Sequence, residues 1–576
     1  MQKGSIIFIN QDTKFGRLKS EDGKEYPFHK NNLIDPSVWD ALSSGDKVTF
    51  KLEKSRHQKD YANNVDILEK PEEDNHIFNV EASDNYLLPE TKIDDSELII
   101  GIVSSVGTPS DRIITPLKDR LTGFGYSVDE IRVSRFLHEP AAGIKEDERI
   151  SHFIKEGDSF REKSNNNSIL AIASAVKIKE LRSQKEKNEE KRNKNAYIIN
   201  SLKHPDEVEL LRKIYGDGFY LFGIHSDKRS RKEYLVQDKH CEPENADKLI
   251  EIDENENKKY GQKTRDTYHL SDFFLNLSDN EKQVKNTIQR FLELIFSDPY
   301  KTPTFDEYAM FMAFNSSVRS ADLSRQVGAV ISRNNQIIST GANDVPKFGG
   351  GLYWAEKDNN GEVKDQKLGR DYTRSVDQNK QSQKHIIENI LKRVKDKALL
   401  EEDKLKELEF ILKESEISDL TEFGRVVHAE MEAILSCSRE GISTKEAILY
   451  CTTFPCHNCA KHIIASGINR VVYVEPYPKS KALEFHDDSI GLQTNLDNQK
   501  PTDKVIFEPF IGVGPRRFLD LFSMSLGAGT KLRRKDKDGA IIERDKTKNI
   551  RTPLLNKSYI ELEEDAEKIW DAFKKY

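Results

Sequence analysis

The chain has 576 residues, which is enough for several domains of about 150 residues each. Lysine and arginine total 90 and aspartate and glutamate total 98, so the formal net charge is −8. This balance excludes a chain-wide electrostatic grip on nucleic acid. No apolar run reaches the roughly 18 residues that cross a bilayer, and the N-terminal sequence MQKGSIIFIN has no extended apolar region before a cleavage site. We therefore expect a cytoplasmic protein that makes no membrane contact.

Residues 1–69 contain short apolar segments separated by turn signals. The predicted strands include SIIFI, FGRLK, YPFHK and KVTFKLE. This pattern is typical of a small β-barrel. The next stretch, 70–95, is acidic and has little periodicity, so we predict a linker there.

Strands and helices alternate over residues 96–302. The apolar run ELIIGIVSSVG is a predicted strand that ends in a Gly/Ser turn, and a predicted helix follows over ITPLKDRLTGFG. AYIINS and FYLFGIHS are later strands, and a predicted helix precedes each of them. This alternation favours a mostly parallel α/β sheet.

Over residues 303–530 the order of elements changes. A predicted helix precedes the strands VGAVISRN and QIISTGAND, and the later strands AILYCT and RVVYVE have the helix CAKHIIASG between them. We predict a second α/β domain, interrupted by a charged helical insertion at 352–423. A polar tail is predicted at 531–576.

The strongest chemical signal is the sequence HAE at 428–430 followed by PCHNC at 455–459. It matches the H-x-E…P-C-x-x-C signature of zinc-dependent nucleobase deaminases. We predict that His428, Cys456 and Cys459 bind one Zn²⁺ per chain and leave the fourth tetrahedral position to water. A C-x-x-C pair alone could be a redox pair or half of a structural zinc site, but the upstream HAE motif favours catalysis.

Glu430 lies two residues after the predicted histidine ligand and is not needed as a ligand itself. We predict that it moves protons, from the activated water to N3 of cytosine and then to the departing amine. The chain has five cysteines, and Cys437 and Cys451 are predicted to be buried side chains outside the ligand set.

Four segments of residues 303–480 carry a resemblance to a known family: RSADLSRQVGAVI, GANDVPKFGGG, VVHAEMEAI and LYCTTFPCHNCAK. They resemble the passage from the first helix to the first strand, the substrate loop and the two zinc motifs of the deoxycytidylate deaminases. The resemblance implies that Asn343 hydrogen-bonds a sugar hydroxyl of a deoxynucleotide. Asp344 and Glu432 stand where that family usually has Gly and often has Asn, so we expect the phosphate end of the substrate to be bound differently.

The segment GIVSSVGTPS at 101–110 lies between a predicted strand and a predicted helix, where a phosphate-binding loop would lie. Its spacing is one residue longer than in GxxxxGK(S/T), and Thr108 and Pro109 take the places of Lys and Ser/Thr. We therefore expect no phosphoryl transfer. Gly101, Gly107 and Thr108 are candidates for nucleotide binding, and the alternative is a purely structural scaffold.

Longer segments extend the resemblance over residues 96–530. They are IIGIVSSVGT, SLKHPDEVELLRKIYGDGFYLFGI, YGQKTRDTYHLSDFF and IFEPFIGVGPRRFLDLFSM. All are similar to the bacterial anti-phage dCTP deaminases, which have a P-loop-kinase-like domain before the deaminase domain. The resemblance implies an enzyme that converts dCTP and dCMP to their uracil forms and is held inactive until infection, in some members by a small RNA. We also expect a homo-oligomer.

Residues 1–69 resemble a cold-shock domain, which is an OB-type barrel, in the order KGSIIFI, KFGRLKSEDGKEYPFHKNNL and GDKVTFKLE. Such domains bind single strands by stacking bases on aromatic side chains beside basic ones. The resemblance implies this role for Phe15, Phe28, His29 and Arg17. Basic and acidic residues are equal in number over this segment, so a protein-docking barrel is the alternative.

The expected fold is therefore multidomain: an OB-type β-barrel, an α/β P-loop-kinase-like domain, and an α/β cytidine-deaminase-like domain with a mixed sheet flanked by helices. The expected function is zinc-dependent hydrolytic deamination of deoxycytidine nucleotides that depletes dCTP in antiviral defence. The alternatives are a housekeeping dCMP deaminase that supplies dUMP, an RNA- or single-stranded-DNA-binding regulator, and an editing deaminase.

Overall fold

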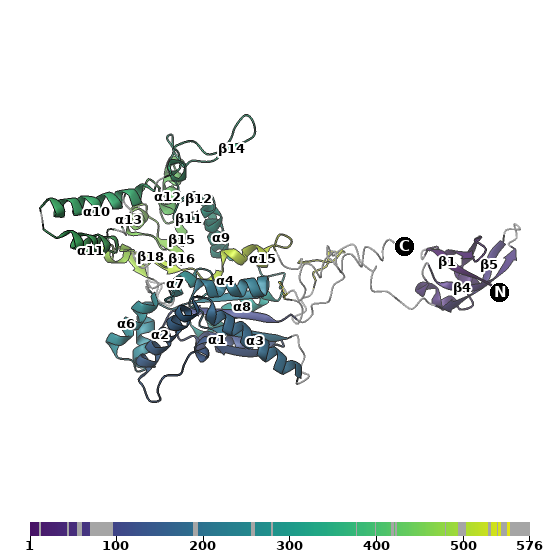
Figure 1. Cartoon of the computed structure of the whole chain (residues 1–576). Helices are drawn as coiled ribbons and strands as arrows, with labels where there is room; N and C mark the ends of the chain where they lie inside the picture. The colour runs from purple at the N-terminus through teal and green to yellow at the C-terminus, as the bar shows by residue number, and fades with distance from the viewer. Residues whose placement is uncertain are drawn as a thin grey trace. The chain divides into compact units, whose positions relative to one another are not determined.

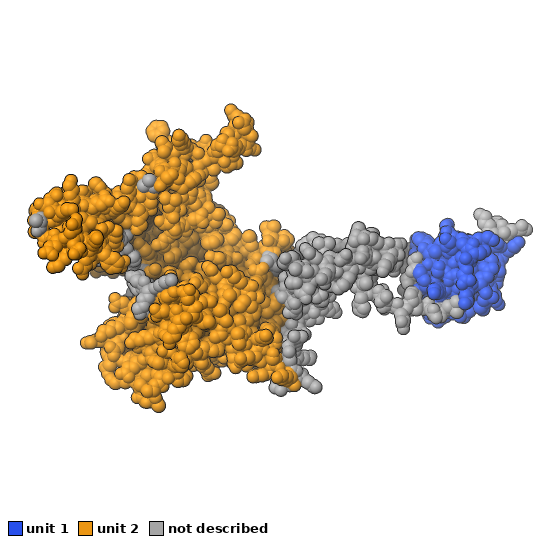
Figure 2. All heavy atoms as spheres, viewed as in Figure 1, with its two compact units in different colours: residues 1–92, 555–576 blue, residues 93–554 orange. Residues whose placement is uncertain are grey.

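The computed structural model of the chain describes residues 1–554 with several gaps. The residues outside the description are 11–12, 43–44, 55–59, 70–95, 188–193, 255–259, 278–279, 376, 398, 416, 418–419, 421–422, 478–479, 493–502, 528–531, 538, 543–549, 553 and 555–576. The predicted linker at 70–95 therefore lies outside the described residues, as does most of the predicted tail. The chain divides into two compact units, residues 1–92 with 555–576 and residues 93–554, which Figure 2 colours separately.

The first unit contains a five-stranded antiparallel sheet in the order β3-β2-β1-β4-β5, which confirms the predicted N-terminal strands. Its strands are β1 (Gln2–Asn10), β2 (Phe15–Ser20), β3 (Glu25–His29), β4 (Lys47–Lys54) and β5 (Asp60–Glu69). The outer strands β3 and β5 also contact each other, so the sheet curls on itself. The core of this unit forms around the fully buried Trp39, on which Phe28 packs edge-on at 5.8 Å between ring centroids.

The second unit begins with a six-stranded sheet in the order β19-β10-β9-β6-β8-β7. Its strands are β6 (Leu98–Ser104), β7 (Ser127–Arg132), β8 (Asn195–Asn200), β9 (Phe219–His225), β10 (Phe273–Asn276) and β19 (Gly512–Val513). All neighbours are parallel except the edge strand β19, which runs antiparallel to β10. The mostly parallel sheet that the alternation predicts is therefore present.

Helices cover both faces of this parallel sheet. They are α1 (Asp111–Gly123), α2 (Glu146–Ser164), α3 (Ile169–Lys187), α4 (Pro205–Tyr215), α5 (Lys228–Gln237), α6 (Pro243–Glu254), α7 (Thr264–Tyr268) and α8 (Glu281–Ile295). Ile100 and Ile102 of β6 pack in one cluster with α1 and α8, whereas Ile99 and Val103 pack in another with α3 and α4. Alternate side chains of one strand thus face two cores, as in a sheet buried on both sides.

The second sheet is mixed, as predicted, in the order β12-β11-β15-β16-β18-β17. Its strands are β11 (Gly328–Arg333), β12 (Gln336–Ala342), β15 (Ile448–Thr453), β16 (Arg470–Glu475), β17 (Ile490–Leu492) and β18 (Val505–Pro509). The helices around it are α9 (Phe305–Ser317), α12 (Ala429–Arg439), α13 (His457–Ala465), α14 (Ala482–Phe485) and α15 (Phe518–Phe522).

The charged helical pattern predicted within 352–423 forms two helices, α10 (Gln378–Asp396) and α11 (Glu402–Lys413), which pack against each other (Figure 1). They follow a short hairpin of β13 (Glu356–Lys357) and β14 (Val363–Lys364). Among the described residues, the helices lack the length and apolar composition needed to span a bilayer.

One hydrophobic core joins the two sheets of the second unit. Val103 of β6 and Phe274 of β10 belong to the same cluster as Met310 of α9, Tyr450 of β15 and Val472 of β16. The parallel sheet and the mixed sheet are therefore packed parts of one compact unit, residues 93–554.

A glycine allows the helix α12 to lie directly on β12. A Cβ atom added at Gly341 would lie 2.1 Å from the carbonyl oxygen of Ala429 and 2.6 Å from the backbone nitrogen of Ala433. Both contacts are with backbone, which cannot move aside without moving the helix. The start of α12 is thus fixed to the sheet by the absence of a side chain at this position.

We expect Gly341→Ala to lower the free energy of unfolding by about 1–3 kcal/mol, because the added methyl group overpacks the contact between β12 and α12. Thermal or denaturant unfolding measures the change. Gly123→Ala is the matched control, since a Cβ there meets nothing within 4 Å. Equal stability of the two variants would contradict the close contact.

Candidate metal centre and adjoining cavities

Three predicted ligands converge where two helices of the mixed-sheet domain begin. His428 directly precedes α12, Cys456 directly precedes α13, and Cys459 lies in the first turn of α13. Their ligand atoms all lie within 4.8 Å of one another. Nδ1 of His428 lies 3.3 Å from Sγ of each cysteine.

This geometry fits a tetrahedral zinc ion. Bonds of about 2.3 Å to sulfur and about 2.0 Å to nitrogen place the two atoms about 3.5 Å apart across a tetrahedral angle. One nitrogen and two sulfur donors also make up a ligand set that leaves one position open. The His428, Cys456 and Cys459 triad is the zinc-binding site of the chain.

The electrostatic environment favours the thiolate at Cys456, whereas the hydrogen bond with Cys456 and burial raise the pKa of the Cys459 thiol. The pKa of the Cys456 thiol is lowered to about 4, chiefly by a hydrogen bond with the Cys459 thiol and further by the adjacent His428. The pKa of His428 is raised to about 9, chiefly by its hydrogen bond with Cys456. The N-terminus of α13 adds partial positive charge at the same place. The lowered pKa of Cys456 favours the thiolate form that a metal ligand requires.

Glu430 lies in the first turn of α12, and only 4% of its surface is exposed. Its Oε2 accepts a hydrogen bond from the Cys459 thiol at 3.4 Å, so the carboxyl group borders the ligand set. Burial raises the pKa of Glu430. A carboxyl group with a raised pKa holds a proton more readily than an exposed one, which suits a group that transfers protons.

A cavity of about 480 Å³ opens onto the metal site, and Asn343 is among its lining residues. Oδ1 of Asn343 accepts a hydrogen bond from the backbone N–H of Val327 at 2.7 Å, and Nδ2 donates to the carbonyl of Arg325 at 2.9 Å. These bonds hold the segment that precedes β11 and leave one amide hydrogen of Asn343 for a ligand.

The two positions that depart from the family pattern face other parts of the chain. Asp344 is buried and forms an ion pair with Arg370 at 3.1 Å. Glu432 forms an ion pair with Arg439 at 2.6 Å. Neither residue lines the cavity at the metal site. Their carboxylates bind arginines of this chain.

Several residues that line the cavity were not predicted from the sequence as site residues. Arg325 lies inside a quoted motif, and Lys380 belongs to the predicted insertion, so both were within reach of such a prediction. Arg265 comes from α7 of the parallel-sheet domain and lies inside the quoted segment YGQKTRDTYHLSDFF, but its spacing from the zinc residues does not indicate that it reaches their cavity.

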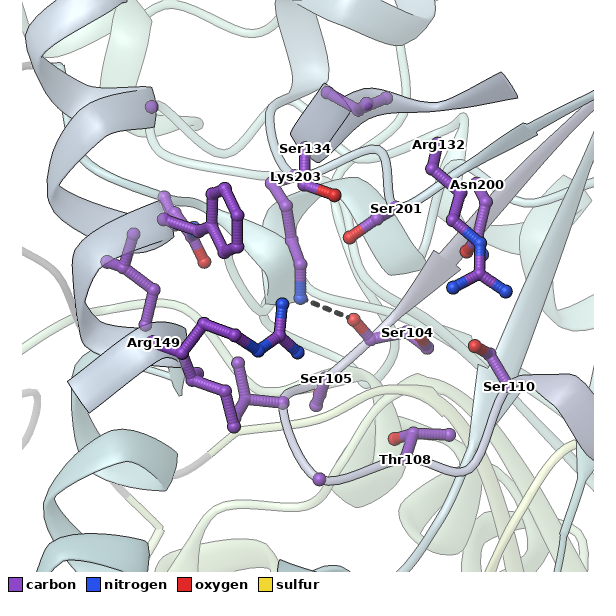
Figure 3. Close-up of a pocket in the computed structure, with 18 of the residues that line it drawn as sticks. Ser104, Ser105, Thr108, Ser110, Arg132, Ser134, Arg149, Asn200, Ser201 and Lys203 are labelled. Carbon is purple, nitrogen blue, oxygen red and sulfur yellow. Dashed lines mark hydrogen bonds between the residues drawn. The ribbon is translucent and has the colours of Figure 1, made fainter. Parts of the chain in front are cut away.

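A second cavity, of about 290 Å³, lies at the carboxyl ends of β6, β7 and β8 (Figure 3). Gly107 and Thr108 line it, whereas Gly101 lies inside β6, where a Cβ would meet Leu202 and Phe219. Figure 3 shows Arg149 and Lys203 among the lining side chains, with the amine of Lys203 donating to the carbonyl of Ser104 at 2.6 Å. Ligands of open α/β sheets commonly bind at this edge.

In the N-terminal barrel, three of the four predicted nucleic-acid residues lie on the surface. Phe15, Arg17 and His29 are exposed, and Phe15 pairs with His29 across β2 and β3. The prediction for Phe28 is wrong, because its side chain is 2% exposed and packs on Trp39 in the barrel core. Side chains alternate along β3, so Phe28 points inward and its neighbour His29 outward.

Comparison with known proteins agrees with this site. The family "Cytidine and deoxycytidylate deaminase zinc-binding region" matches residues 303–475. The deoxycytidylate deaminase of Enterobacteria phage T2 is 34% identical to this chain over 170 residues, which are 30% of this chain and 79% of that protein. The deoxycytidylate deaminase of Saccharomyces cerevisiae is 23% identical over 295 residues, 49% of this chain and 76% of that protein.

Among solved structures, the dCMP deaminase of cyanophage S-TIM5 in complex with dCMP and dUMP is 18% identical to this chain, with a TM-score of 0.20. The match covers 37% of this chain and 100% of that one.

We expect Cys456→Ala to lower zinc affinity by more than about tenfold, because even the loss of a residue that only supports a ligand costs that much. Zinc content of the purified protein, measured by atomic spectroscopy, checks this. Cys241→Ala, a buried cysteine of the parallel-sheet domain, is the control and should keep its zinc. Full zinc occupancy in Cys456→Ala would contradict the ligand assignment.

Proposed function

The chain belongs to the deoxycytidylate deaminase family, and we propose that it deaminates both dCTP and dCMP to the corresponding uracil nucleotides. It is a zinc-dependent hydrolase of deoxycytidine nucleotides. The observation that carries the proposal is the convergence of a His, Cys, Cys set with a buried glutamate at one wall of a cavity. In the reaction a C4–O bond forms on the cytosine ring, the C4–N bond breaks, and ammonia leaves.

The chain's own residues supply the proton transfers. Zinc, when bound, supplies an activated water at neutral pH. Glu430 takes a proton from the attacking water and delivers it to N3 of the cytosine ring. It then takes the second proton from the new hydroxyl group at C4 and passes it to the amino group, which leaves as ammonia. Its raised pKa suits both directions of transfer, since burial weakens the preference for the charged form. Asn343 holds the loop beside β11 and offers its remaining amide hydrogen to a sugar hydroxyl.

We place this activity in antiviral defence, in which a cytoplasmic enzyme depletes dCTP after infection and stays inactive before it. The resemblance of residues 96–530 to the anti-phage dCTP deaminases supports this role. A housekeeping dCMP deaminase that supplies dUMP is the alternative, and the preference for dCTP over dCMP distinguishes the two.

The parallel-sheet domain is proposed to bind a nucleotide without transferring phosphate. Gly107 and Thr108 line its cavity beside Arg149 and Lys203, which supports binding of an anionic group. Gly101 would contribute through the close packing of β6 against its neighbours. No lysine occupies the Walker position of the loop, which supports binding without catalysis.

A second proposed function is binding of single-stranded RNA by the N-terminal barrel, which would connect the enzyme to a regulatory RNA. The outer face of β1 and β2 carries the exposed rings of Phe8 and Phe15, and Arg17 lies opposite Phe8 in the register of these strands. Aromatic rings beside a basic side chain are the elements of a stacking surface.

We expect Glu430→Gln to keep zinc and to lose turnover by about 10²–10⁴-fold, the usual contribution of a general acid–base group. Chromatography of the products from dCTP, dCMP, CTP and single-stranded DNA measures the reaction. Glu440→Gln, exposed at the end of the same helix, is the control. Wild-type turnover in Glu430→Gln would refute the proposed mechanism. Formation of uracil only in DNA would refute the proposed substrate.

We expect Phe15→Ala to weaken binding of a single-stranded RNA by about 1–3 kcal/mol, the value of one stacked base. Gel-shift titration of the full chain with a labelled oligonucleotide measures this. Ile34→Ala removes another exposed apolar side chain, which lies outside the strands, and should leave affinity unchanged. Identical affinities of wild type and Phe15→Ala would remove the stacking surface.

A further inference from the structure

One arginine at the zinc cavity comes from the other domain and has no assigned role. Arg265 belongs to α7, which contacts β6, α4 and α6 of the parallel-sheet domain and β16 of the mixed sheet, and it lines the same cavity as His428 and Glu430. Only 27% of its side chain is exposed. Its Nε and Nη1 atoms are buried and lack a hydrogen-bond partner among the described residues. The ion pair that it forms, with the adjacent Asp266 at 3.5 Å, makes no hydrogen bond.

The acidic residues that line the cavity have hydrogen-bond partners other than Arg265; these residues are Asp322, Asp371, Asp377 and Glu430, and Glu430 accepts from Cys459. Asp371 accepts a hydrogen bond from Arg425 at 2.6 Å. Asp322 and Asp377 each accept backbone N–H bonds from residues that follow them in the chain, at 2.9 Å. A guanidinium nitrogen that is buried without an acceptor lowers stability. The arrangement therefore indicates an acceptor that binds there from outside the chain.

The other cations of the cavity differ from Arg265 in this respect. Arg325 forms an ion pair with Glu475 at 3.3 Å, and Lys380 donates to the side chain of Gln383 at 3.1 Å. Arg265 is thus the cation of this cavity whose guanidinium nitrogens are buried without an acceptor among the described residues.

Arg265 also lies where the zinc cavity continues into another one. A cavity of about 280 Å³ shares Arg265, Phe454 and Tyr477 with the zinc cavity. Lys228 and Arg231 line this second cavity together with Asp227 and Asp253. A ligand with its base at the metal site and a long anionic chain would fit this shape better than a compact one.

The side chain of Arg265 projects from a firmly held helix. Thr264 is buried and donates to Asp253 at 3.0 Å, and Asp253 also accepts from Lys203 at 3.0 Å. Tyr268 is buried and packs edge-on against Phe274 of β10, 5.3 Å between ring centroids. A donor fixed in place before the ligand arrives loses little freedom on binding.

We propose that Arg265 forms a subsite for the distal phosphates of a nucleoside triphosphate, and that the parallel-sheet domain thereby selects dCTP over dCMP at the zinc site. This inference rests on the proposed deaminase function. The planar guanidinium fork is suited to phosphate oxygens, because two parallel N–H bonds can form at once. A monophosphate lacks the groups that would reach this position.

The test compares Arg265→Ala with wild type as full-length, zinc-loaded proteins, by kcat/KM for dCTP and for dCMP. We expect kcat/KM for dCTP to fall about 10- to 100-fold, the range for hydrogen bonds to a charged group, and kcat/KM for dCMP to change less than about threefold. Arg265→Lys should fall between, since it keeps the charge and loses the fork. Arg229→Ala, an exposed arginine of α5 that pairs with Glu233, is the matched control and should leave both substrates unaffected.

The following results would contradict the proposed subsite. Equal losses on both substrates, or a lower melting temperature with loss of zinc in Arg265→Ala, would make Arg265 a structural residue and overturn the subsite. An unchanged preference in Arg265→Ala would overturn it as well. If wild type converts neither nucleotide, the proposed function fails. Calorimetry of dCTP and dCMP binding to Glu430→Gln, with and without Arg265→Ala, then tests the subsite separately. Loss of dCTP affinity in the double variant supports the subsite, and unchanged dCTP affinity overturns it.

Discussion

The zinc site depends on one constraint, that two helices begin at the same place. His428 precedes α12 and Cys456 precedes α13, so the ligand atoms meet only if both helix starts are fixed within a few tenths of an ångström. The position of α12 follows from its contact with β12 at Gly341, where a side chain would collide with the helix backbone. The position of α13 follows from β15, which runs directly into the PCHNC segment. Backbone packing thus decides the relative positions of the zinc ligands.

This explains why the local part of the site could be predicted and the distant part could not. The ligands and Glu430 lie within two short motifs, and their chemistry is legible from residue type and spacing. Arg265 lies more than 150 residues before the first zinc ligand, in a helix of five residues, and reaches the cavity only because the two sheets share a core. Sequence spacing carries no signal for such a contact.

The prediction for Phe28 was wrong for a local reason. A motif match names neighbouring positions but does not say which of them points outward. The alternation of β3 settles this, since Tyr26 and Phe28 are buried and His29 is exposed. Helices and strands could be predicted from the sequence more readily than the orientation of individual side chains. The alternating strands and helices over 96–302, and the changed order of elements after 303, leave clear patterns in the sequence.

The loop after β6 is linked by hydrogen bonds to the helix that carries Arg265. In a phosphate-binding loop the backbone N–H groups point at the ligand, but here the N–H of Val106 donates to Asp253 at 2.9 Å. Asp253 also holds Lys203 and Thr264, and Thr264 begins the helix that carries Arg265. The loop, the buried aspartate and α7 therefore form one hydrogen-bonded chain that leads from the parallel sheet to the zinc cavity. A change in the loop would alter Arg265 before it altered any zinc ligand, because His428 and the two cysteines are fixed by the mixed sheet instead. Substrate selection and metal chemistry thus depend on different domains of the same compact unit.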